Sequence, residues 1–143
     1  MAKSIETEIE INASAETVWQ ILTSFNQYAS WNPFIRSING KASTGEELNV
    51  QIQPPGGKCM SFNPQVMTVI PKREFSWVGR VLFPGLFDGH HCFRIIPISK
   101  DRVRFIHSES FSGLLSAIIL KLVGDSTYAG FIEMNEALKN QAE

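Results

Sequence analysis

The chain opens with a strict alternation of apolar and polar residues over 5–11, which predicts a strand with one buried face. Apolar residues then recur at helical spacing over 18–25, behind Ser14, whose side chain favours the N-cap position. The Asn32-Pro33 pair ends this helical region, because proline disfavours helix in the residue before it. We therefore expect a first strand followed by two short helices.

The chain from residue 35 to residue 112 reads as β-structure cut by turn-forming sequences. After Gly113, an apolar stripe predicts a long helix to about residue 140, with a bend or short break near Gly124-Asp125. This order predicts the α+β class, with a curved seven-stranded antiparallel sheet wrapped around the C-terminal helix, in a single domain over 1–143. Besides 5–11, the expected strands are 35–40, 47–53, 60–70, 74–82, 89–97 and 102–112.

The alternation in the last two strands predicts which side chains face inward. The odd positions of 102–112 are the more apolar ones, so they should face the helix. A three-residue loop at 99–101 then pairs 98 with 102, 95 with 105, 93 with 107 and 91 with 109. His90 and His91 consequently point to opposite faces. We expect His91, His107 and Glu109 to lie inward, within reach of one another.

Three interpretations of His91, His107 and Glu109 stay open. Two histidines and a carboxylate are chemically sufficient for a metal site. Alternatively, Glu109 orients or accepts a proton from His91, as in a general acid–base pair, in which His107 is also a candidate. The third interpretation, which we favour, is a polar patch that binds a ligand oxygen or satisfies its own hydrogen bonds. We expect neither a metal ion nor a cofactor.

Composition narrows the class of partner. A formal net charge of −1 offers no basic face for nucleic acid. The longest apolar stretch, 114–123, is too short to span a bilayer and is interrupted by Lys121, so we expect no stable membrane insertion. The N-terminus lacks a signal-peptide core, and the two cysteines are too few for a disulfide framework, so we expect a cytoplasmic protein.

Four segments together resemble a known family: SAETVWQILTSFNQYASWNPFI, the PGLFDGHH segment, HSESFSG and GFIEMNEALK. They are similar to the SRPBCC superfamily, which groups START, birch-pollen-allergen and polyketide-cyclase proteins, and most of all to its small bacterial polyketide cyclase/dehydrase-like members. The resemblance covers nearly the whole chain. It implies the helix-grip fold, with a deep cavity between sheet and long helix that holds an apolar small molecule.

The ten phenylalanines and three tryptophans agree with such a cavity, and several occupy inward positions. Gly79 on an inward face favours an open space or a bend of the sheet. In the family, short helices close the cavity where Trp31 and Phe34 lie. We expect the loop with Phe83, Leu86 and Phe87 to form the opposite lip. The expected ligand-binding residues are Trp31, Phe34, Trp77, Gly79, Phe83, Phe87, His91, Phe93, Phe105, His107, Glu109, Phe111, Leu115, Ile119 and Leu122.

The function that these features favour is the binding of a small hydrophobic ligand, either a lipid, a polyketide-like molecule or an aromatic one. The alternative is a cyclase- or dehydratase-like enzyme that uses the His/Glu pair in the same cavity. A protein-interaction or stress-response module is a third class. The expected partner is a small hydrophobic molecule, and the expected oligomeric state is a monomer or homodimer.

Overall fold

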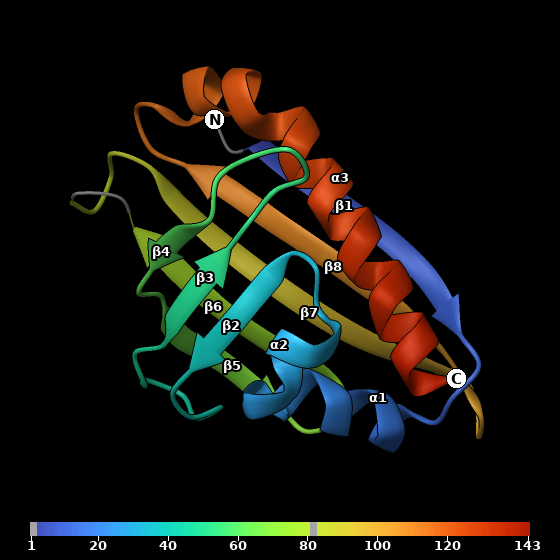
Figure 1. The fold of residues 1–143 in the computed structure, drawn as a ribbon. Helices are drawn as coiled ribbons and strands as arrows, with labels where there is room; N and C mark the ends of the chain where they lie inside the picture. The colour runs from blue at the N-terminus through green and yellow to red at the C-terminus, as the bar shows by residue number, and fades with distance from the viewer. Residues whose placement is uncertain (1–2, 81–82) are drawn as a thin grey trace.

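The computed structural model describes residues 3–80 and 83–143. Over these residues the chain forms eight strands, three α-helices and one 3₁₀ turn (Figure 1). In chain order they are β1 (Lys3–Ile11), α1 (Ala15–Thr23), the 3₁₀ turn η1 (Phe25–Gln27), α2 (Tyr28–Trp31), β2 (Ile35–Asn39), β3 (Asn49–Ile52), β4 (Met60–Phe62), β5 (Gln65–Ile70), β6 (Glu74–Arg80), β7 (Asp88–Ser99), β8 (Arg102–Ser112) and α3 (Ser116–Ala142).

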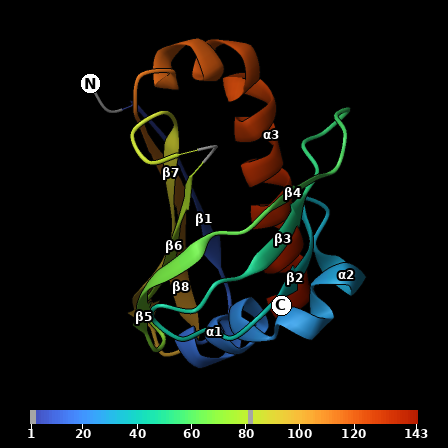
Figure 2. The ribbon, with the colours of Figure 1, turned by 90° about the vertical axis from the view of Figure 1, so that its left-hand side faces the viewer.

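The strands form two antiparallel sheets. The larger sheet has the order β1-β8-β7-β6-β5, and the smaller one has the order β2-β3-β4. Helix α3 and the smaller sheet both lie on one face of the larger sheet (Figures 1 and 2). A bridge between Glu47 and Gln65 and a hydrogen bond from the Val66 amide to the Glu46 carbonyl join the two sheets. The result is the predicted α+β arrangement, in which strands curve around a long C-terminal helix.

The predicted count of seven strands in one sheet is wrong. The expected strand 60–70 is divided at Asn63-Pro64 into β4 and β5. Proline has no N–H to donate and restricts its own backbone, so it interrupts a ladder. The chain leaves the smaller sheet here and enters the larger one. The expected strand 74–82 corresponds to β6, and its last two positions lie outside the described residues.

The segment after β1 folds as expected. Ser14 caps α1, because its hydroxyl oxygen accepts a hydrogen bond from the Thr17 amide at 3.1 Å. Val18 and Leu22 are the buried residues of this helix. The turn η1 and the short helix α2 follow, and Tyr28 of α2 is fully buried. Helix α1 therefore closes the lower end of the larger sheet, whereas α2 lies beside β2 of the smaller sheet (Figure 2).

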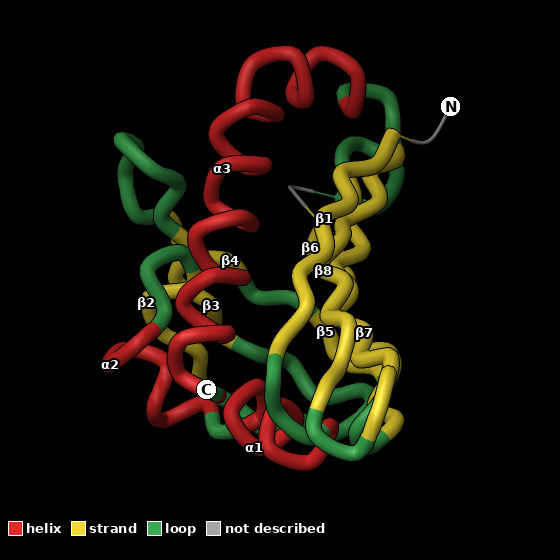
Figure 3. Tube along the Cα trace, turned by 90° about the vertical axis from the view of Figure 1, so that its right-hand side faces the viewer, coloured by secondary structure: helices red, strands yellow, loops and turns green. Residues whose placement is uncertain are grey.

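Helix α3 is continuous from Ser116 to Ala142, so the alternative of a break near Gly124-Asp125 is wrong. One glycine costs only about 1 kcal/mol relative to alanine, which a long helix tolerates. The first turns of the helix do curve away from the axis of the rest (Figure 3). Apart from Ser116 at its start, the buried residues of the helix belong to the C-terminal half and include Phe131, Met134 and Leu138. No helix within residues 3–80 and 83–143 is long and apolar enough to cross a membrane.

The hairpin of β7 and β8 has the predicted register at its inward-facing pairs. Ile95 lies opposite Phe105, Phe93 opposite His107, and His91 opposite Glu109. The predicted pairing of 98 with 102 is wrong, because a bulge between Pro97 and Ser99 brings Ser99 opposite Arg102. The bulge lies at the end of the hairpin, so the inward face above it is unaffected.

Candidate functional site

Two buried histidines from neighbouring strands contact each other at the centre of the molecule. His91 is on β7 and His107 is on β8, and their Nε2 atoms are 2.7 Å apart. His90, by contrast, is exposed. The predicted division of the adjacent histidines between the two faces of the sheet is therefore confirmed.

A polar chain continues from His107 to two residues that the sequence analysis did not single out. His107 Nδ1 is 2.9 Å from Asn135 Oδ1 on α3. Asn135 Nδ2 donates to Thr7 Oγ1 at 2.8 Å, and Thr7 Oγ1 donates to the His107 carbonyl at 2.9 Å. Both residues carried a signal, because Thr7 interrupts the isoleucines of the inward face of β1, and Asn135 interrupts the apolar stripe of α3.

The environment of His107 is apolar. Its ring stacks on Phe131, with centroids 3.9 Å apart and planes 10° apart. Burial lowers the pKa of His107 well below its ordinary value, and the neighbouring His91 lowers it further, against the hydrogen bond to Asn135. His107 is therefore a neutral imidazole in the folded protein.

Glu109 completes the predicted group on the other side of His91. Its Oε1 atom is 3.6 Å from His91 Nδ1, an ion-pair distance rather than a hydrogen bond. Gly89 lies beside it, and a Cβ atom there would collide with Glu109 Oε2. The structure thus brings His91, His107 and Glu109 together, but the shortest polar contact of His91 is with His107.

The geometry gives the metal interpretation no support. Two nitrogens bound to one tetrahedral zinc ion lie about 3.3 Å apart, with the ion between them. The two Nε2 atoms here face each other at 2.7 Å, and Glu109 lies on the opposite side of the His91 ring. Over the described parts of the chain, no three His, Cys, Asp or Glu residues are arranged to hold a metal ion.

Several predicted wall residues form a filled core at the level of the two histidines. The ring of Phe93 lies 5.5 Å from Trp77, 6.1 Å from Phe105 and 4.8 Å from His107, centroid to centroid. Phe34 packs 5.7 Å from Phe131. The predicted wall residues that are buried are Phe34, Trp77, Phe93, Phe105 and Phe111. Side chains therefore fill the interior on the side of His91 where Phe93 lies.

Trp31 does not fit its predicted role at the mouth of the cavity. Its ring packs 5.2 Å from that of Tyr28. It lines a surface pocket of about 250 Å³ that is formed by residues of α1, by the turn after it and by Gln141 of α3. Asn32 Oδ1 accepts hydrogen bonds from the amides of Phe34 and Ile35. This turn separates Trp31, at the lower end, from Phe34 against α3.

The predicted lip is held against the start of α3. The amides of Leu114 and Leu115 donate to the carbonyls of Gly85 and Leu86 at 3.1 and 2.9 Å. Phe87 stacks on Phe111 at 5.6 Å, whereas Phe83 is exposed. The loop with Phe83 and Phe87 therefore lies beside the first turn of the helix, as a lip would.

The inner face of the larger sheet is partly reached by solvent at Glu109 and Gly79, although Phe111 beyond Glu109 on β8 is buried. On β8, His107 is fully buried, but two residues further on the same face the side chain of Glu109 is 18% exposed. On β6, a Cβ atom at Gly79 would meet a single neighbour within 4 Å, Cβ of Pro64 at 3.9 Å. A β-carbon at Gly79 would therefore have room on this face.

The upper half of α3 carries exposed apolar residues, and not all of them face the sheet. Leu115 is exposed and Ile119 is half-buried. Leu122 is 78% exposed, which does not fit its predicted role as a wall. At 3.6 residues per turn, Leu122 lies about 180° around the helix from Phe131, whereas Leu120 lies within about 20° of it. Leu120, which is half-buried, is the better candidate.

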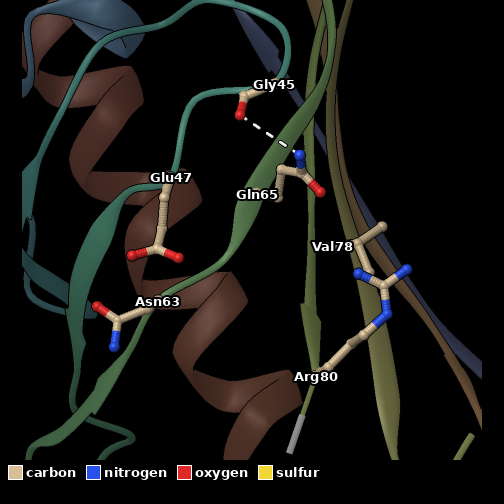
Figure 4. Close-up of a pocket in the computed structure, with 6 residues that line it drawn as sticks. All are labelled: Gly45, Glu47, Asn63, Gln65, Val78 and Arg80. Carbon is tan, nitrogen blue, oxygen red and sulfur yellow. Dashed lines mark hydrogen bonds between the residues drawn. The ribbon is translucent and has the colours of Figure 1, made fainter. Parts of the chain in front are cut away.

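A pocket of about 380 Å³ lies elsewhere, at the seam of the two sheets (Figure 4). Glu47 and Arg80 lie on opposite sides of it, and Gln65 donates to the Gly45 carbonyl across its rim at 3.4 Å. Arg80 and Val78 alternate with Trp77 along β6, so they belong to the other face of the strand. This polar pocket contains none of the predicted site residues.

Comparisons with known proteins agree with this architecture. The family model for polyketide cyclase/dehydrase and lipid transport proteins matches residues 2–136. No curated protein matches the chain significantly. The Zhui aromatase/cyclase from Streptomyces sp. R1128 aligns with a TM-score of 0.76 at 12% identity, over 99% of this chain and 94% of that one.

Two further solved structures are similar. A START superfamily protein from Mycobacterium smegmatis has a TM-score of 0.73 at 19% identity, over 97% of this chain and 96% of that one. Norcoclaurine synthase from Thalictrum flavum, in complex with dopamine and hydroxybenzaldehyde, has a TM-score of 0.73 at 15% identity, over 99% and 86%. These likenesses confirm the predicted helix-grip fold. The model of the polyketide cyclase/dehydrase and lipid transport family matches most of the sequence, so this chain belongs to that family.

Proposed function

We propose that the protein binds a small hydrophobic molecule on the inner face of the larger sheet, above His91 and beneath the first half of α3. The observation that carries this proposal is the change along one face of β8. His107 is fully buried there, whereas Glu109 is reached by solvent. The packed rings around Phe93 form the floor of the proposed site, and the loop that carries Phe87 forms its lip.

The lining of this region suits an apolar ligand. Trp77 and Phe111 face inward, and a β-carbon at Gly79, on the same face as Trp77, would meet a single neighbour within 4 Å. Such a region needs few polar groups, which orient the ligand while the apolar walls supply most of the affinity. Here the polar group within reach is Glu109, backed by His91.

The family supports a ligand of this kind. Its description joins polyketide cyclisation with lipid transport, and both involve molecules with large apolar parts. One structural relative is an aromatase/cyclase, and another was solved with dopamine and hydroxybenzaldehyde. An aromatic or polyketide-like molecule is therefore the class that we propose first, with a lipid as the alternative.

A second candidate is an enzyme of the cyclase or dehydratase type in the same site. The observation that favours it is the contact of His91 with a partly exposed carboxylate at 3.6 Å. Replacing Glu109 by Gln would then abolish turnover of a polyketide-like substrate but leave its binding nearly intact. A carrier would show binding without turnover in both proteins.

The binding proposal is tested with the neutral fluorescent probe N-phenyl-1-naphthylamine. We expect Gly79→Leu to weaken its binding at least about tenfold, because the new side chain would fill the space beside Trp77. Val78→Leu, on the other face of the same strand, is the matched control and should bind as the wild type does. Weakened binding in Val78→Leu alone would place the probe at the sheet seam and overturn the proposal. Native mass spectrometry with lipid extraction would identify any ligand that co-purifies.

A further inference from the structure

We propose that His91 and Glu109 together form a site that holds a proton. A hydrogen-bonded chain through Thr7, Asn135 and His107 determines which ring nitrogen of His91 is free to bind it. Thr7 and Asn135 act in it as positioning residues. The ligand class that this site would take is an apolar molecule with a carbonyl or hydroxyl oxygen. This last part rests on the proposed function, whereas the protonation pattern can be tested without any ligand.

The hydrogen-bonded chain starts at the backbone carbonyl of His107, which can only accept a hydrogen bond. The Thr7 hydroxyl has one hydrogen, and it donates that hydrogen to the His107 carbonyl at 2.9 Å. Thr7 Oγ1 must therefore accept from Asn135. This requirement places the Asn135 amide nitrogen at 2.8 Å from Thr7 and its carbonyl oxygen toward His107. The orientation of the side-chain amide is thus determined by the network.

The same logic determines the hydrogen on each histidine. Asn135 Oδ1 can only accept, so His107 Nδ1 carries a hydrogen and donates it at 2.9 Å. Because burial keeps His107 neutral, its Nε2 has a free electron pair. His91 Nε2 must then carry the hydrogen that joins the two rings at 2.7 Å. Each neutral ring therefore has a single tautomer.

One basic nitrogen remains in the pair, and it is His91 Nδ1. A proton that enters the pair binds there, 3.6 Å from Glu109 Oε1. The other groups packed against the His91 ring are Trp77, Phe93 and Phe131, which carry no charge, and the neutral His107. Glu109 is accordingly the group that balances the charge of a protonated His91.

The ligand would meet this site through Glu109. The His91 ring is buried, whereas the Glu109 side chain is 18% exposed on the inner face. When the proton of the pair lies on Glu109, the carboxyl group donates a hydrogen bond to a ligand carbonyl oxygen. Without that proton, the carboxylate accepts from a ligand hydroxyl. A pure hydrocarbon would leave the carboxylate desolvated and unpaired, so the site selects against it.

Nitrogen-15 NMR of the ligand-free protein tests the protonation pattern. We expect the neutral His107 to carry its hydrogen on Nδ1 and the neutral His91 to carry it on Nε2. Thr7→Val removes the hydroxyl and should give His107 a mixture of tautomers, whereas Thr7→Ser keeps the hydroxyl and should keep the wild-type pattern. If Thr7→Val does not fold, Asn135→Leu tests the same link. A hydrogen on His107 Nε2 in the neutral wild-type pair would overturn the proposal.

Two probes of nearly equal shape test the ligand class, 2-acetylnaphthalene and the hydrocarbon 2-ethylnaphthalene. We expect the wild type to favour the ketone, and Glu109→Met to reduce that preference about three- to tenfold, the effect of one hydrogen bond between neutral groups. Glu109→Gln keeps a donor and should keep the preference. An unchanged preference in Glu109→Met would overturn the ligand class but not the binding site. If neither probe binds the wild type, the proposed function fails, and the ligand class fails with it.

Discussion

His107 of β8 and Phe131 of α3 stack face to face at a centroid distance of 3.9 Å. This contact joins the sheet to the helix directly above the filled core, and both residues are fully buried. It also covers the ring whose nitrogens join Asn135 to His91. The apolar packing of α3 and the hydrogen bonds of the polar chain therefore meet at the His107 ring. We expect the stability of the domain to be sensitive to the loss of this contact.

Removing the Phe131 ring should be strongly destabilising. Phe131→Ala leaves a cavity beside His107, and we expect the free energy of unfolding to fall by about 3–5 kcal/mol. Leu122→Ala, on the exposed side of the same helix, should change it by less than about 0.5 kcal/mol. Urea unfolding of both variants checks this. Equal losses in the two would contradict the packing described for α3.

The lowered pKa of His107 predicts a pH dependence of stability. The folded protein keeps this ring neutral, whereas the unfolded chain protonates it below the ordinary value of 6.5. The unfolded state therefore binds more protons below pH 6.5, and the wild type should lose stability as the pH falls from there toward the lowered pKa of the folded state. This ring contributes a slope of up to about 1.4 kcal/mol per pH unit.

His107→Gln is the variant that isolates this contribution. It removes the titrating ring, so its stability should fall less steeply than that of the wild type between pH 7 and pH 5, although it starts lower. Urea unfolding at three pH values gives both slopes. Parallel slopes would show that His107 takes up its proton in the folded state too.

Two glycines of α3 should respond in opposite directions to alanine. At Gly130 a Cβ atom would collide with the buried ring of Phe34, so Gly130→Ala should cost about 1–3 kcal/mol in overpacking, offset in part by better helix propensity. At Gly124 the nearest side-chain atom, Leu120 Cδ2, is 4.0 Å away. Gly124→Ala should therefore raise the free energy of unfolding by about 0.5–1 kcal/mol. Stabilisation by both substitutions would mean that the Phe34 ring is free to move.

The junction between the lip and α3 should depend on Gly113. This residue has a φ of +106°, and a Cβ atom there would collide with the backbone carbonyl of Leu86. Gly113→Ala should separate the lip from the helix and speed hydrogen exchange at the amides of Leu114 and Leu115, which donate to the lip. Gly85→Ala is the control, because it has a similar φ of +90° but no atom within 4 Å of the added carbon. It should show the smaller change at those two amides.

The sequence predicted the relations that depend on alternation alone. The pairing of His91 with Glu109 follows from a period of two, and a bulge further along the hairpin did not disturb it. The division at Pro64 was missed, because the residues on both sides of it have strand character. The proline itself was the available signal.

The relations between distant elements were harder to predict. Asn135 meets His107 only because α3 crosses the sheet at that level, and nothing in the local pattern sets the height of the crossing. Leu122 was assigned to the cavity from its apolar character, although its phase relative to Phe131 places it on the far side. Trp31 was assigned from the family resemblance, and the turn at Asn32 places it at the opposite end.

The hydrogen-bonded chain from Thr7 to His91 also bears on how this protein changes over evolutionary time. The residues of this chain are hydrogen-bonded to one another in sequence. A single apolar replacement therefore leaves a buried polar partner without its hydrogen bond, which lowers the free energy of unfolding by about 1–3 kcal/mol. Replacing the set together avoids that cost. Among descendants of this sequence, Thr7, His91, His107 and Asn135 should therefore be inherited or lost as a unit, whereas Glu109, at the solvent end, is free to vary with the ligand.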